Sequence, residues 1–140
     1  NRECGGLYSG GVSSAHVADP ALTNLVSSGL YVPTLTSVAN INSSSPFQCH
    51  YIVNGDVVTV SLKVTITPTA AASTTTQLGV SLPIASNLAA TEDATGTLIS
   101  QFNVVAAVLA DATNDRVTVQ FASTNTSANV LYGQFSYRIK

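Results

Sequence analysis

The chain has 140 residues and a net charge of −2, and only 9% of its residues are charged, against about 25% in a typical soluble domain. Its five Lys and Arg residues are scattered along the sequence, so no basic stripe exists to neutralise phosphates and nucleic-acid binding is not expected. No apolar run reaches the ~18 residues of a transmembrane helix. Ser, Thr and Asn replace the missing charge, a composition typical of virion shells and secreted β proteins rather than cytosolic enzymes.

Residues 1–29 are predicted to form an N-terminal arm or linker, and residues 30–140 a single β domain. The pair Asp19-Pro20 predicts a short helical turn over 21–26, ended by Gly29. The chain contains no Met, so we expect it to be a processed product or a fragment of a longer polypeptide.

The first β segment is "LYVPTLTSVANI", residues 30–41. It is predicted to be one edge strand, because Pro33 has no backbone N–H to donate to a neighbouring strand. The stretch "SSSP", residues 43–46, is predicted to be a turn.

The clearest pattern in the chain is "CHYIVNGDVVTVSLKVTITPT", residues 49–69. Asn54-Gly55 between two apolar runs predicts a β-hairpin with a type I′ turn. On the first strand, one face should carry Phe47, Cys49, Tyr51 and Val53. On the second, strict alternation should point one set of side chains into a core, namely Val58, Val60, Leu62, Val64 and Ile66.

Further strands are predicted around 78–82, 97–102, 103–111, 116–122 and 130–140, separated by Pro, Gly, Asn and Ser. No helix of normal length is expected. About eight short strands favour an all-β fold, an antiparallel two-sheet β-sandwich of jelly-roll type with an extended N-terminal arm.

The strand "VVAAVLA", residues 104–110, is apolar on both faces. It is either a central or loop-covered strand, or a subunit interface formed by its outward row of Val105, Ala107 and Leu109. The sequence favours the two interpretations equally.

No catalytic, cofactor-binding or metal site is predicted. His16 and His50 lack metal-ligand spacing, and Cys49 and His50 should point to opposite faces of a strand. Cys4 and Cys49 are predicted to be free thiols rather than a disulfide. The carboxylates fall in loops and turns, where they are solvated or cap the backbone. In "DATND", residues 111–115, the oxygen ligands match no known calcium loop, and a tight hairpin needs the same residues.

Aromatic residues are the remaining candidates for binding. Phe135 and Tyr137 alternate with Arg138 on the last strand and are predicted to be core residues. Tyr31 and Tyr132 are predicted to be surface groups on which a glycan ring could stack.

The order "GLYVPTLT", "YIVNGDVVTVSLKVTIT" and "LGVSLPIASN" resembles a β-sandwich module of tailed-bacteriophage virion proteins, found in tail fibres, head fibres and capsid decoration. The resemblance covers residues 29–140. The residues that carry it are Gly29, Tyr31, Pro33, Thr34, Leu35, Tyr51, Gly55, Val58, Val60, Leu82 and Pro83.

Such a resemblance implies a non-enzymatic virion component that forms a homotrimer and contacts capsid or tail proteins. Residues 1–29 would anchor it. The alternative is a receptor- or glycan-binding tip domain of a tail fibre, with a host surface glycan as its partner.

Overall fold

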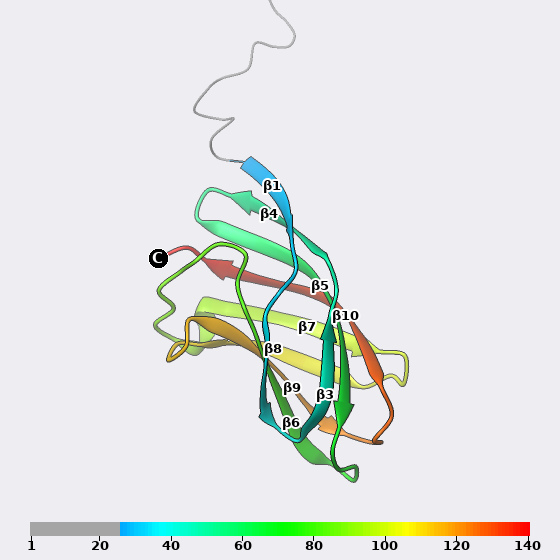
Figure 1. The fold of residues 1–140 in the computed structure, drawn as a ribbon. Helices are drawn as coiled ribbons and strands as arrows, with labels where there is room; N and C mark the ends of the chain where they lie inside the picture. The colour runs from blue at the N-terminus through cyan, green and yellow to red at the C-terminus, as the bar shows by residue number, and fades with distance from the viewer. Residues whose placement is uncertain (1–25) are drawn as a thin grey trace, which may run out of the picture.

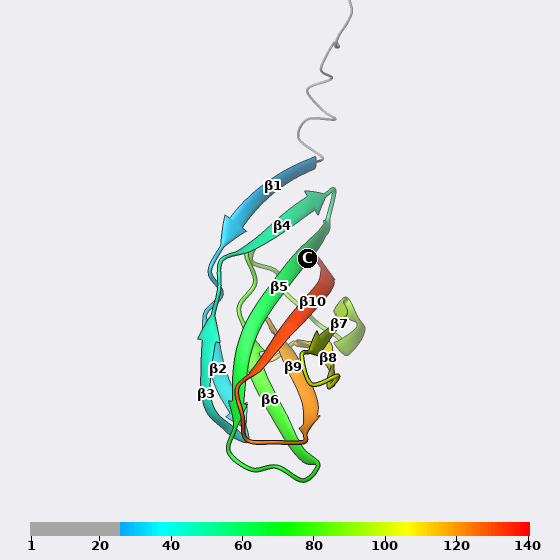
Figure 2. The same cartoon turned by 90° about the vertical axis from the view of Figure 1, so that its right-hand side faces the viewer.

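A computed structural model describes residues 26–140 (Figures 1 and 2). This part of the chain is all-β, with ten strands, one short 3₁₀ helix and no α-helix. The elements are β1 Val26–Tyr31, β2 Leu35–Ala39, β3 Ile41–Pro46, β4 Cys49–Asn54, β5 Val57–Pro68, β6 Thr74–Val80, η1 Thr91–Asp93, β7 Ala94–Ser100, β8 Val105–Asp111, β9 Arg116–Ser123 and β10 Asn129–Arg138. The predicted all-β antiparallel class is therefore confirmed.

The strands form one continuous antiparallel sheet in the order β1-β4-β5-β10-β7-β8-β9-β6-β2. β3 also pairs with β5, beyond the part of β5 that pairs with β4. The sheet curls, so that β6 and β9 lie across the molecule from β5 and β10 (Figure 2). The corner between β2 and β3 brings the β2 edge next to β3, so the curled sheet almost closes around its core.

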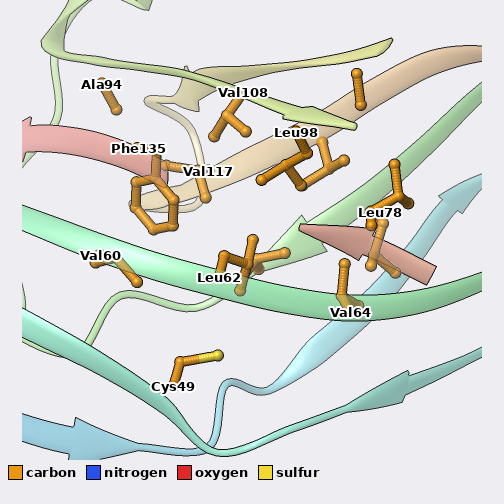
Figure 3. Close-up of a cluster of buried hydrophobic side chains, with 14 of the residues drawn as sticks. Cys49, Val60, Leu62, Val64, Leu78, Ala94, Leu98, Val108, Val117 and Phe135 are labelled. Atoms are coloured by element: carbon orange, nitrogen blue, oxygen red, sulfur yellow. The ribbon is translucent and has the colours of Figure 1, made fainter. Parts of the chain in front are cut away.

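The core fills the concave side of the sheet, and β5 runs through its centre. Every second residue of β5 is buried, as the alternation predicts, and the intervening residues are only partly covered. Phe135 and Tyr137 are also buried, as predicted. Figure 3 shows Leu62, Leu98 and Phe135 gathered between the strands that carry them.

Two glycines allow β7 and β10 to pack large side chains at close range. Gly96 pairs with Phe135, and Gly133 pairs with Leu98. A Cβ atom at Gly133 would collide with the carbonyl oxygen of Thr97 and with the Leu98 side chain. Each large inward residue therefore lies opposite a residue without a side chain, which lets the adjacent strands share one layer of the core.

The predicted hairpin is present, but its turn lies one residue further along the chain. Asn54 pairs with Val57, so Gly55 and Asp56 are the central turn residues. Gly55 has φ 65° and Asp56 has no positive φ. This is the φ pattern of a type II′ turn rather than the predicted type I′ turn, because only the first central residue needs the left-handed region.

Two predictions near the N-terminal end of the sheet are wrong. Residues 30–41 do not form one strand but contain the end of β1, all of β2 and the start of β3. β1 pairs with β4, whereas β2 pairs with β6, and buried Pro33 lies in the connection between them. "SSSP" is not a turn but part of β3, which pairs with β5. Its small polar side chains suit an edge position, where the backbone ladder supplies the stabilisation.

The start of β1 bears on the predicted arm. β1 begins at Val26 and contains Gly29, so Gly29 does not end a helical turn. The remainder of that predicted turn, and residues 1–25 of the arm, lie outside the described residues.

Candidate functional site

The outward row of β8 is the first sequence-predicted site. Val105 is 61% exposed and Ala107 is also exposed, whereas Leu109 is half-buried beside η1. β8 is a central strand, flanked by β7 and β9. Its inward row, Ala106 and Val108, is fully buried. The strand is therefore apolar on both faces, although only its inner face is covered by the core.

The register of the sheet extends this row into a larger feature that the sequence pattern did not indicate. Val105 pairs with Ile99, Ile99 with Tyr132, and Tyr132 with Lys63. Phe47 contacts Lys63 from the break between β3 and β4. We call this set the outer stripe: Phe47, Lys63, Tyr132, Ile99 and Val105.

The outer stripe crosses the strands on the convex face of the sheet. Neighbouring strands are about 4.8 Å apart, so the side chains lie close enough to form one surface. Ile99 and Tyr132 are each 48% exposed. Phe47 was predicted to share a face with Cys49, but it contacts Lys63 on the outer face instead. The pleat is interrupted between Pro46 and Cys49, so alternation does not carry across it.

Lys63 places one positive charge near one end of the outer stripe. Its Nζ lies 4.3 Å from the centroid of the Phe47 ring and 5.7 Å from that of Tyr132. Both distances allow cation–π attraction. Within residues 26–140 the ion pairs are Arg116–Asp111, Arg138–Asp56 and Lys140–Asp93, so none of them involves Lys63. The ammonium group is thus held by aromatic rings.

Neutral polar side chains lie beside the outer stripe. In the next row across the sheet, Ser61 pairs with Gln134, Gln134 with Thr97, and Thr97 with Ala107. Further along, Gln77 donates a hydrogen bond to the side chain of Gln120 at 2.9 Å. The convex face therefore combines one apolar band with hydroxyl and amide groups, whose desolvation costs less free energy than that of charged groups.

The two candidate stacking aromatics differ. Tyr132 lies on the outer face, as predicted. Tyr31 is half-buried against the core, contrary to the prediction. Its ring meets Tyr51 edge-on with centroids 6.0 Å apart, and its hydroxyl donates to the Ser81 carbonyl. Burial, with Cys49 and Tyr137 nearby, raises the Tyr31 pKa. Its ring helps fill the core rather than offering a free face.

Cys49 and His50 point to opposite sides of β4, as predicted. Cys49 is buried and its thiol donates to the Phe47 carbonyl at 3.3 Å. His50 is exposed on the outer face between Leu30 and Ser61. Their opposite directions prevent the two from acting as a pair. Cys4 and His16 lie outside the described residues.

The "DATND" carboxylates serve the hairpin between β8 and β9. The Asp111 carboxylate accepts hydrogen bonds from Asn114 and from Arg116 at 2.9 Å each. Partial burial acts to raise the Asp111 pKa, but these bonds and the Arg116 charge outweigh it and lower the pKa. Asp115, with φ 50°, accepts a bond from the Leu88 amide. Across residues 26–140, no three His, Cys, Asp or Glu side chains are grouped for a metal.

Asp93 anchors the long connection before β7 and gives the domain an acid-sensitive contact. Its carboxylate accepts bonds from the Ala89 and Ala90 amides at 2.8 and 2.9 Å and pairs with Lys140 at 3.1 Å. These bonds, the Ala89 amide first, lower the Asp93 pKa from 3.8 to about 2. A depressed carboxyl pKa stabilises the fold above the unfolded-state pKa, and this stabilisation is lost as pH falls through the folded-state pKa.

We therefore expect the stabilising effect of Asp93 to be complete at pH 5 and to fade between about pH 4 and 2. Urea midpoints measured through this window for the unmodified chain and Asp93→Asn should differ at pH 5 and converge at low pH. A constant difference between the two chains across the window would show that the carboxylate charge does not hold this connection.

Comparison of the chain with protein-family models, with curated proteins and with solved structures found no match. No helix in the described part of the chain is long and apolar enough to cross a membrane. The structure of residues 26–140 has no pocket. The outer stripe is thus the candidate functional site of the described surface.

Proposed function

We propose that this protein is a non-enzymatic structural component of a phage virion, a fibre or capsid-decoration module that assembles as a homotrimer. In this proposal the curled sheet corresponds to a jelly-roll-like sandwich, and residues 1–29 anchor it to capsid or tail proteins. The observation that carries the proposal is the outer stripe, with Val105 61% exposed at one end of it.

Burial of the outer stripe supplies the driving force for assembly. Contiguous exposed apolar surface on a soluble chain marks an interaction site. Interface cores are enriched in aromatic residues and poor in charge, and the outer stripe contains Phe47 and Tyr132 with one lysine. In a closed ring of three copies, the outer stripe of one copy would pack against a different surface of the next.

Charged substitutions in the outer stripe test the proposal. Val105→Asp and Ile99→Asp should each abolish the trimer, because a carboxylate at the centre of an interface loses its hydration without gaining a partner. Thr75→Asp is the matched control, since Thr75 is an exposed residue on β6, away from the outer stripe. Light scattering measures the mass of each chain. Equal masses for all variants would refute this interface.

Glycan recognition is a second candidate function, favoured by one observation. The half-exposed Tyr132 ring lies beside the ammonium of Lys63, which combines a stacking surface with a hydrogen-bond donor. A glycan array probed with the unmodified chain and with Tyr132→Ala separates this function from assembly alone. Reproducible binding that Tyr132→Ala abolishes would support the binding module, and an array without signal would argue against it.

A further inference from the structure

In the described part of the chain, the sheet ends at β1, an edge strand with a regular register and without charged residues or Pro. Among the strands of residues 26–140, β1 pairs only with β4, in a continuous register from Val26–Asn54 to Tyr31–Cys49. Beyond this ladder, residues 26–31 make no backbone hydrogen bond within the described part of the chain. Alternate N–H and C=O groups of β1 therefore point away from the sheet without a strand to receive them.

Natural edge strands are commonly guarded by charged residues, Pro or a bulge. The sequence of β1, "VSSGLY", contains no charge and no Pro, and its register has no shift. The opposite edge differs: β2 has a register shift between Ser37 and Ala39, and β3 lies beside it. Of the two sheet ends that the structure describes, only the β1 edge lacks such a feature.

Exposed apolar side chains accompany this edge. Leu30, on β1, is 64% exposed and is the most exposed large apolar residue of residues 27–140. Val32 follows at 57%, and Ile52, at 48%, lies diagonal to Leu30 on β4. An added strand would satisfy the backbone groups of β1 and cover Leu30 at the same time.

We propose that β1 pairs antiparallel with β1 of a second copy across a two-fold axis, joining two sheets into one. A strand is the occupant because its backbone groups alone match those of an open edge. The strand of a second copy fits because antiparallel pairing of a segment with itself is self-complementary. Within β1 there is no charge to oppose the approach of two copies, and Leu30 of each would pack against the other's edge.

This contact deepens the proposed assembly role and rests on it for its biological meaning, but it uses a different surface. The outer stripe spans β5, β10, β7 and β8 together with Phe47, whereas β1 lies beyond β4 at the end of the sheet (Figure 1). The outer stripe would close the trimer, and the β1 edge would link one trimer to the next. The two contacts can therefore be removed separately.

Sedimentation velocity of the full chain over a wide concentration range tests the edge contact. Leu30→Lys places a guarding charge on β1, and Val38→Lys is the matched control, because Val38 is 48% exposed on the guarded edge strand β2. Leu30→Lys should weaken the concentration-dependent step beyond the trimer by about tenfold or more, whereas Val38→Lys should leave it unchanged. A Val105→Asp chain should still form dimers, and Val105→Asp with Leu30→Lys should be monomeric.

The outcomes separate the two proposals. A trimer whose mass does not change with concentration, or equal effects of Leu30→Lys and Val38→Lys, would overturn the edge contact and leave the outer stripe intact. Dimers of the Val105→Asp chain that Leu30→Lys abolishes support the edge contact. If the Leu30→Lys chain does not fold, hydrogen exchange of the unmodified chain at several concentrations tests the edge contact instead. The β1 amides should become protected as concentration rises, and unchanged exchange would overturn the proposal.

Discussion

Replacing Asn40 with alanine is expected to lower the free energy of unfolding by about 3 kcal/mol. Asn40 turns the chain between β2 and β3 with φ 55°, a conformation that Asn tolerates far better than Ala. Its amide nitrogen donates to Thr76 Oγ1 at 2.9 Å and to the Ala70 carbonyl at 3.0 Å, and its oxygen accepts from the Ala70 amide at 2.8 Å. The corner where the curled sheet nearly closes depends on this side chain.

Two further variants divide the effect of Asn40 into its causes. Asn40→Gly keeps the backbone conformation accessible but removes the side-chain bonds, and should cost about half as much as Asn40→Ala. Asn40→Asp keeps the acceptor for the Ala70 amide and loses both donors. Urea unfolding followed by circular dichroism measures each loss. If Asn40→Ala and Asn40→Gly were equally destabilised, the left-handed backbone would not contribute as described.

Gly133→Ala is expected to destabilise the fold by about 3 kcal/mol, through overpacking rather than a cavity. The new Cβ would meet the Thr97 carbonyl and the Leu98 side chain, so the β7–β10 pair would have to separate. Gly79→Ala is the matched control. At Gly79 the nearest atoms belong to the guanidinium of Arg116, the flexible end of a side chain that can shift.

Gly79→Ala should therefore cost less than about 1 kcal/mol. Thermal unfolding of both variants beside the unmodified chain measures the difference. A Gly133→Ala chain as stable as Gly79→Ala would contradict the close packing of β7 on β10.

The features that the sequence predicted well are those that depend on neighbours along the chain. β5 was predicted correctly because twelve residues alternate without interruption, and the position of each side chain follows from period two. The hairpin was found because Asn-Gly joins two apolar runs. Its predicted turn type is wrong, because Asn54 and Gly55 suit the two central positions of a type I′ turn. The strand register instead places Gly55 at the first central position and Asp56 at the second.

The errors arose where the long-range arrangement overrides the local pattern. Nothing in "LYVPTLTSVANI" shows that its two halves join opposite ends of the sheet. The Ser-rich stretch in β3 has little strand propensity, and its ladder with β5 stabilises it instead. Phe47 was assigned to the wrong face because alternation was extended through a break in the pleat.

The candidate site was predicted only in part. Val105 and Ala107 are exposed as an outward row, and Tyr132 lies on the outer face, as their patterns indicated. That Tyr132, Ile99 and Val105 are adjacent follows from the register of two strand pairs, which a single sequence does not contain. The wrong prediction for Tyr31 concerns a residue whose two neighbours, Leu30 and Val32, are exposed. Tyr31 itself contacts Tyr51 and Ser81, and these long-range contacts cannot be read from the local pattern.

The molar mass of the unmodified chain in solution is the most direct test of the proposal that this protein is an assembly module. Sedimentation equilibrium gives this mass without assumptions about shape. The outer stripe predicts at least a trimer of the 14.4 kDa chain that persists on dilution. A single species with the mass of one chain at all concentrations would contradict the proposed function.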